Sequence, residues 1–179
     1  MKKSKVVQLL RSCEVSEING MEHFLRSPYF NEDEAVIHLF QYLKDFYPDF
    51  SAPELKKRRV FSQVFPGQAY DDKQLRYLIS DLNKLLERFL AFQKVEDTPY
   101  QLSLALLGSL SERGLNKAYR QASRHLEKEL TPHAAKSSEI FWAQLQWSEI
   151  KEGHFLRQRA RKHDISLQYY ADDLDKYYF

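Results

Sequence analysis

Apolar side chains recur every three or four positions along most of this chain, and runs of strictly alternating apolar and polar residues are missing. Such spacing collects apolar groups on one face of a helix, whereas a half-buried strand needs alternation. The chain also has 24 Leu but only 15 β-branched residues (7 Val, 6 Ile and 2 Thr), and unbranched side chains lose less rotamer freedom in helices. The sequence therefore predicts an all-α fold, a helical bundle of antiparallel helix hairpins.

The most regular of the expected helices covers residues 71–94. Its apolar residues repeat every three or four positions from 75 to 92, which favours a central core helix over a short coiled coil. Pro66 and Gly67 break the chain just before it, so we expect it to form a hairpin with the preceding helix. The expected helices span residues 16–26, 31–47, 52–65, 71–94, 99–112, 115–130 and 139–152, with a last one from 164 onward.

Several helix ends are marked by residues that bond to free backbone groups. Asp71 is a natural N-cap, because its carboxylate can accept the N–H groups that a first helical turn leaves unpaired. Ser51 and Thr98 each open a capping-box pattern that has proline inside the first turn. Gly108 stands within an apolar helix, and we expect it to permit close helix packing.

A polar, proline-containing segment at 95–99 divides the chain into two expected parts. Residues 1–97 are predicted to form an N-terminal helical bundle, and residues 98–179 a helical hairpin array. The array has the spacing of tetratricopeptide-like stacking, although the signature residues of that repeat are missing. The two parts either are separate subdomains or share one continuous core. The aromatic end at 177–179 leads us to expect that the chain is a fragment of a longer protein.

Composition and motifs argue against several classes of function. The 27 basic and 25 acidic residues leave a net charge of +2, too little for a general attraction to nucleic acid or anionic membranes. The single cysteine favours a reducing, cytoplasmic setting, and no apolar run is long enough to span a membrane. Phosphate-binding loops, nucleophile elbows and zinc-binding patterns are missing. We therefore predict no enzymatic activity, catalytic residue, cofactor or metal ligand.

Basic residues in the region 52–94 suggest one alternative, a nucleic-acid-binding regulator. The two helices predicted there could form a helix-turn-helix, in which the second helix enters a major groove and basic side chains hold phosphates. Nearby acidic residues favour the simpler interpretation of a solvated, charge-balanced surface. The candidate nucleic-acid contacts are Lys56, Lys57, Arg58, Arg59, Lys73, Arg76 and Lys84.

Aromatic residues near the C-terminus support the leading hypothesis, a non-enzymatic protein-interaction or scaffold module. Aromatic side chains make up 14% of the chain, and tyrosine combines an apolar ring with a polar tip that suits interfaces. The expected partner is another protein or the remainder of a longer chain. An enzyme with an unfamiliar site is a third, weaker hypothesis. The candidate protein contacts are Tyr169, Tyr170, Tyr177, Tyr178 and Phe179.

Residues 24–31 (FLRSPYFN), together with 39–43, 60–66 and 80–90, resemble an uncharacterised family of mostly helical bacterial proteins that are longer than this chain. The LDKYY segment at 174–178 resembles an internal motif of the same family. The resemblance implies a helical fold, a bacterial source and a continuation of the chain. It implies no activity.

Overall fold

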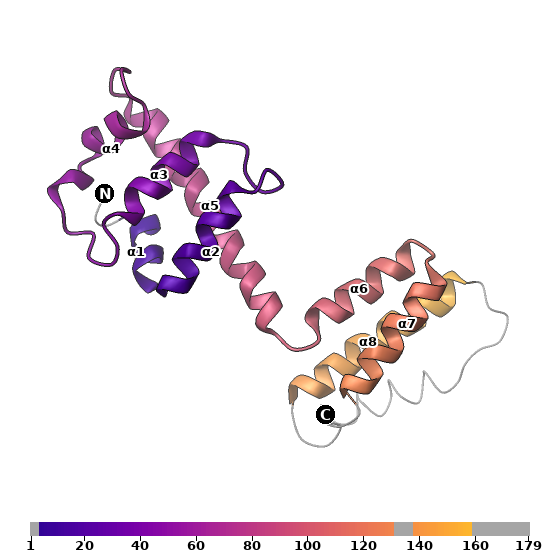
Figure 1. Ribbon diagram of the computed structural model, residues 1–179. Helices are drawn as coiled ribbons and strands as arrows, with labels where there is room; N and C mark the ends of the chain where they lie inside the picture. The colour runs from indigo at the N-terminus through magenta and orange to yellow at the C-terminus, as the bar shows by residue number, and fades with distance from the viewer. Residues whose placement is uncertain (1–3, 131–137, 159–179) are drawn as a thin grey trace. The chain divides into compact units, whose positions relative to one another are not determined.

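The computed structural model describes residues 4–130 and 138–158 (Figure 1). In these residues the chain forms α-helices and one 3-10 turn but no strand, which confirms the predicted all-α class. The elements are α1 (Lys5–Ser12), α2 (Val15–Arg26), α3 (Glu34–Lys44), η1 (Pro53–Leu55), α4 (Lys57–Val64), α5 (Asp72–Asp97), α6 (Gln101–Glu112), α7 (Asn116–Leu130) and α8 (Ser138–Arg157).

Contacts divide the chain into two compact units. Unit 1 comprises Met1–Gln93 and unit 2 comprises Lys94–Phe179, so the division falls within the last turns of α5. The boundary expected from sequence, between residues 97 and 98, coincides with the end of that helix. Each unit has a hydrophobic core of its own.

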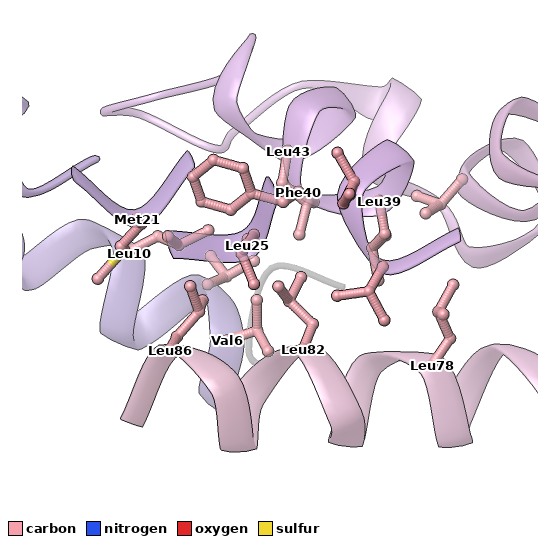
Figure 2. Close-up of a cluster of buried hydrophobic side chains, with 14 of the residues drawn as sticks. Val6, Leu10, Met21, Leu25, Leu39, Phe40, Leu43, Leu78, Leu82 and Leu86 are labelled. Atoms are coloured by element: carbon pink, nitrogen blue, oxygen red, sulfur yellow. The ribbon is translucent and has the colours of Figure 1, made fainter. Parts of the chain in front are cut away.

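The core of unit 1 is built around α5, the helix predicted over residues 71–94. Figure 2 shows Leu78, Leu82 and Leu86 of α5 pointing toward side chains from the three N-terminal helices. The three- and four-residue spacing explains this arrangement, because it places these leucines along one side of the helix. Their partners in Figure 2 are Val6 and Leu10 of α1, Met21 and Leu25 of α2, and Leu39, Phe40 and Leu43 of α3.

Helix α1 was not among the expected helices. The hydroxyl of Ser4 accepts a hydrogen bond from the backbone N–H of Val7 (3.4 Å), and this N-cap starts the helix. Val6, Val7 and Leu10 are all buried. The helix is only eight residues long, too short to be stable alone, so packing against the core stabilises it. Its apolar repeat is correspondingly short, which is why the sequence pattern did not predict it.

The predicted cap of α5 is confirmed, but the predicted capping box at Ser51 is wrong. Asp71 Oδ1 accepts the N–H groups of Lys73 (2.8 Å) and Gln74 (3.2 Å). The Ser51 hydroxyl donates to the carboxylate of Asp49, and the N-cap of the next element is Ala52. The chain then forms the short turn η1, and α4 begins only at Lys57, so the helix expected over 52–65 is interrupted. Helix α4 packs mainly against α3.

The predicted capping box at Thr98 is also wrong. The Thr98 hydroxyl donates to the carbonyl of Lys94 at the end of α5, and Thr98 is not the N-cap of the next helix. The N-cap of α6 is Tyr100, which has a left-handed backbone (φ 68°) and makes no side-chain cap bond. Helix α6 therefore begins at Gln101, two residues later than expected.

Helix α6 is the central helix of unit 2, because it contacts both α7 and α8. The expectation for Gly108 is wrong: apart from its own stretch of helix, no heavy atom of the described residues lies within 4 Å of the position that a Cβ atom would take there. Close packing in this unit therefore involves other residues. Its buried apolar side chains are Leu104, Leu107, Tyr119, Leu126, Leu130, Ile140, Ala143 and Trp147.

Candidate functional site

The turn between α2 and α3 carries the most exposed large aromatic side chain of the described residues, Tyr29, which is 82% exposed. Pro28 ends α2, because the residue before a proline avoids helical backbone angles. The Ser27 carbonyl accepts the backbone N–H of Asn31 (3.0 Å), and Asn31 Nδ2 donates to the carbonyl of Leu25 (3.0 Å). These bonds fix the turn and hold the Tyr29 ring outward.

Tyr29 belongs to an aromatic patch that we define as Phe24, Tyr29, Phe30, Arg88 and Phe92. The rings of Phe24 and Phe30 are stacked with centroids 4.0 Å apart, and Phe92 lies 5.4 Å from Phe30. The Arg88 guanidinium lies 5.0 Å from the Phe30 ring and 5.6 Å from the Phe92 ring. Cation–π contacts of this kind order an exposed arginine. The patch therefore presents exposed aromatic surface that is fixed to α5.

Sequence reasoning did not identify this patch as a site. The FLRSPYFN segment was singled out only for its resemblance to a protein family, although it contains Phe24, Tyr29 and Phe30. Arg88 and Phe92 come from α5, where their spacing is that of ordinary helical residues. Only the fold brings the two segments together.

Two of the candidate nucleic-acid contacts meet at one carboxylate, that of Asp72. Lys57 Nζ lies 2.8 Å from Oδ1, and Arg76 Nε lies 3.0 Å from Oδ2. Hydrogen bonds from Lys57 and from the Tyr70 hydroxyl lower the pKa of Asp72 below its ordinary value. Acidic neighbours thus compensate much of the expected basic surface. Two further candidates form ion pairs: Arg59 with Glu54 (3.1 Å) and Lys84 with Asp81 (2.8 Å).

The other three candidates have no ion pair with the described part of the chain. The Arg58 guanidinium lies 5.1 Å from the Tyr70 ring, and Lys73 Nζ lies 5.8 Å from the Tyr77 ring. Lys56 is the exposed N-cap of α4. The Tyr77 ring is exposed, whereas the Tyr70 ring is partly buried. A basic group next to an exposed ring is a combination that can contact nucleic acid.

The candidate protein contacts Tyr169, Tyr170, Tyr177, Tyr178 and Phe179 lie outside the described residues. So does the helix expected from residue 164.

A hollow of about 650 Å³, lined by both polar and apolar side chains, lies between α2, α3 and α4. Glu22 is its central carboxylate: Lys44 Nζ lies 2.8 Å from Oε2, and Gln41 donates to Oε1 (3.4 Å). The hydrogen bond from Lys44, followed by that from Gln41, lowers the pKa of Glu22 to about 2. Because this charge is already paired, the network links α2 to α3 and offers little to an outside ligand.

A buried serine and a buried histidine are in contact in unit 2. Ser111 is 2% exposed and His154 is 8% exposed, and Ser111 Oγ lies 3.0 Å from His154 Nδ1. Arg157 Nη1 also donates to Ser111 Oγ (3.0 Å), and the Tyr119 ring stacks on the imidazole at 3.6 Å. Burial and the Arg157 charge lower the pKa of His154. A nucleophilic serine needs access to substrate, so this cluster is better suited to joining α6, α7 and α8.

The hydrogen bonds around His154 determine which nitrogen of its neutral ring carries the hydrogen. Gln158 Nε2 donates one hydrogen to Asn116 Oδ1 (2.8 Å) and the other to His154 Nε2 (2.5 Å). The neutral ring therefore carries its hydrogen on Nδ1 and donates it to Ser111. Sequence analysis missed this cluster because its members come from three different helices.

The described residues contain no cluster of three or more His, Cys, Asp or Glu side chains that could hold a metal ion. Nor does any helix among them combine the length and apolar character needed to cross a membrane. Comparisons of the chain with protein-family models, curated proteins and solved structures found no match.

Proposed function

We propose that this chain is a non-enzymatic α-helical protein-interaction or scaffold module, and that the aromatic patch of unit 1 binds its partner. The observation that carries the proposal is the exposure of Tyr29 on a turn fixed at both ends by hydrogen bonds. A rigid exposed ring loses little conformational entropy on binding, because its position is already fixed.

The composition of the aromatic patch fits a protein partner. Tyrosine, phenylalanine and arginine are enriched in interface cores, and tyrosine and arginine are frequent among the side chains that dominate binding energy. The Phe24 and Phe30 rings stack on each other, and the Tyr29 ring makes an edge contact with Phe30, with centroids 4.9 Å apart. A partner that covers the patch would remove apolar surface from water, which is the main favourable contribution to association.

The finer features of the module belong to the same proposal. A tetratricopeptide-like stack in residues 98–179 is supported by the contacts of α6 with both α7 and α8. A cytoplasmic setting is supported by a single, buried Cys13 thiol, and a bacterial source by the FLRSPYFN resemblance. The absence of catalysis is supported by the burial of Ser111, which closes the described Ser–His pair to substrate.

Affinity capture with matched variants tests the proposal. The bait is the full chain, and the variants are Tyr29→Ala with Phe92→Ala in one protein and Tyr77→Ala in another. Tyr77 is also exposed and also lies in unit 1, but it is outside the aromatic patch. We expect the wild-type chain and Tyr77→Ala to retain the same protein from cytosol after nuclease treatment at physiological salt. The double variant should lose that protein.

Two results contradict the proposal. One is a captured protein that the double variant retains as well as the wild type does. The other is a set of captured proteins that nuclease removes completely, since this would show that nucleic acid is the bridge.

A second candidate function, nucleic-acid binding through residues 52–94, is favoured by the arrangement of Arg58 over Tyr70 and Lys73 over Tyr77. The ion pairs on Asp72 weigh against it, because Lys57 or Arg76 would have to give up its ion pair with Asp72 in order to contact a phosphate. A nucleic-acid complex through this surface should weaken steeply with salt.

A further inference from the structure

Helix α6 is apolar on two opposite sides. Leu104 and Leu107 are buried in the core of unit 2, while Leu102 and Leu106 are 55% and 50% exposed. At 100° per residue, positions 102, 106, 109 and 113 form one line on the helix surface, opposite the buried positions. A helix with apolar residues around its whole circumference is usually covered on both sides. The exposed line, which we call the α6 stripe, therefore has the character of an interface.

The two ends of the α6 stripe carry opposite charge. Arg113 lies at the C-terminal end of the α6 stripe. Its guanidinium donates to the carbonyl of Ser109 (3.1 Å), so the Arg113 side chain lies along the stripe. Leu102, at the other end, borders a hollow of about 490 Å³ that also contains the side chains of Glu96, Glu129 and Lys128. Two carboxylates and one ammonium group line this hollow; Glu129 already lies 3.2 Å from His125 Nε2, so Glu96 is the carboxylate that is open to a further cation.

We propose that a second copy of this chain covers the α6 stripe by packing its own α6 antiparallel to the first. In this arrangement Leu106 of each copy packs beside Ser109 of the other, near the two-fold axis, and Leu102 faces Arg113 of the second copy. Each Arg113 then reaches the hollow beside Leu102 of the other copy. The stripe is about 16 Å long at 1.5 Å per residue, which matches this exchange of ends.

The antiparallel direction follows from the charges. A parallel pair would place the two Arg113 guanidinium groups side by side, whereas the antiparallel pair places each of them beside Glu96 and Glu129. It also opposes the two helix dipoles, which is favourable. A two-fold interface of this kind is closed, so the expected product is a dimer and not a filament.

The size of the α6 stripe sets the expected affinity of the dimer. Stable interfaces bury about 800 Å² on each partner, and four positions of one helix provide less. We therefore expect association at micromolar or higher chain concentrations, in rapid exchange. The inference is independent of the aromatic patch, because the α6 stripe lies in unit 2 and the patch in unit 1.

Sedimentation velocity over a concentration series of the full chain tests the proposal. The wild type should show a reversible monomer–dimer equilibrium, and Leu106→Glu should weaken it at least tenfold. Leu156→Glu is the matched control, since Leu156 is an exposed leucine on α8 of the same unit. It should leave the dimer unchanged. Circular dichroism checks that all variants keep their helix content.

A charge exchange identifies the contact. Arg113→Glu and Glu96→Arg should each weaken self-association several-fold, because each homodimer then contains two like-charged contacts. An equimolar mixture should restore association to near the wild-type level, since both contacts of the mixed dimer again join opposite charges. A wild-type chain that stays monomeric into the millimolar range overturns the proposal. So does a dimer that Leu106→Glu leaves intact, or a mixture that gives no recovery.

Discussion

Gly20 of α2 lies directly against the ring of Phe89 on α5: a Cβ atom at residue 20 would be 2.9 Å from Phe89 Cζ. Phe89 is buried, and its ring makes an edge contact with Phe24 at 5.6 Å. The ring therefore has little freedom to move away. This contact is where the helix that precedes the aromatic patch meets the central helix of unit 1.

We predict that Gly20→Ala destabilises unit 1 even though alanine is the better helix former. The helix-propensity gain is about 1 kcal/mol, while overpacking of a filled core typically costs about 1–3 kcal/mol. We expect a net loss of about 1 kcal/mol. Urea unfolding followed by far-ultraviolet circular dichroism measures the effect, and an unchanged or higher midpoint contradicts the packing argument.

Gly108→Ala should have the opposite effect. Gly108 is also inside a helix, but nothing lies within 4 Å of its Cβ position, so only the propensity gain remains. We expect unit 2 to be stabilised by about 0.5–1 kcal/mol. Both tryptophans of the chain, Trp142 and Trp147, belong to unit 2, so their fluorescence reports its unfolding separately. A lower midpoint would show that the helix needs glycine there.

The contrast between these two glycines shows how far the sequence could predict the fold. Periodicity identified the described helices other than α1, because a stripe such as that of α5 depends only on spacing. It could not distinguish Gly20 from Gly108, since close approach depends on which residue faces each glycine across the core. The wrong caps at Ser51 and Thr98 have a related cause: each element starts later than expected, with Ala52 and Tyr100 as its N-cap residue.

The candidate site was less predictable than the fold. Asp72 lies among the candidate basic residues in sequence, but its role as the shared partner of Lys57 and Arg76 requires α4 and α5 to be placed together. The aromatic patch likewise joins a turn to a distant helix. Patterns within one segment cannot show such contacts, because each segment alone has an ordinary composition.

Glu22 should make the stability of unit 1 sensitive to acid. Its pKa of about 2 in the folded chain is below its ordinary value of 4.5, so the unfolded chain binds this proton more readily. The stabilisation is present above pH 4.5 and is lost as the pH falls toward 2. We expect it to amount to about 1–2 kcal/mol, after allowance for the partial solvent exposure of the pair.

Glu22→Gln provides the comparison. Other carboxylates also titrate in this range, so the quantity to measure is the difference in unfolding free energy between wild type and variant at pH 6 and at pH 3. We expect the wild type to be more stable at pH 6 and this advantage to shrink at pH 3. An advantage that is constant with pH would show that the Glu22–Lys44 bond does not stabilise the fold.

His154 should give unit 2 a pH dependence at higher pH. Burial, followed by the charge of Arg157, lowers the folded-state pKa below the ordinary 6.5. The unfolded chain therefore binds the proton first, and the stabilisation present above pH 6.5 is lost as the pH falls below it. Protonation would also place a hydrogen on Nε2, where it would face the N–H that Gln158 donates, so that two donors would be opposed. Tryptophan fluorescence in urea at pH 7.5 and pH 5.5 measures the loss, which His154→Gln should reduce.

Gln158→Glu tests the cause of this effect. A carboxylate at position 158 would accept the Nε2 hydrogen of a charged His154, so the variant should raise the pKa of His154 and flatten the pH dependence. Proton-detected NMR titration of the imidazole measures this pKa directly. A pKa that falls further in the variant would contradict the assigned bonding.

Asp72→Asn separates the two candidate functions. In the wild type, Asp72 holds both Lys57 and Arg76, so removing its charge releases two cations on the surface that the nucleic-acid hypothesis requires. If this surface binds nucleic acid, the variant should bind a labelled DNA duplex more tightly than the wild type. The slope of log K against log salt should then steepen by about one to two.

Glu22→Gln is the control for this comparison, because it makes the same change in net charge and also releases two cations, Lys44 and Arg26, neither of which is among the candidate contacts. Fluorescence anisotropy at several salt concentrations measures all three proteins. Equal affinities for the two variants would mean that only overall charge matters. If neither the wild type nor Asp72→Asn binds at low salt, the nucleic-acid hypothesis is wrong and protein interaction is the function that the surface supports. If only Asp72→Asn binds, the ion pairs on Asp72 are what keeps the wild-type surface from nucleic acid, since cations that are already neutralised release few counterions.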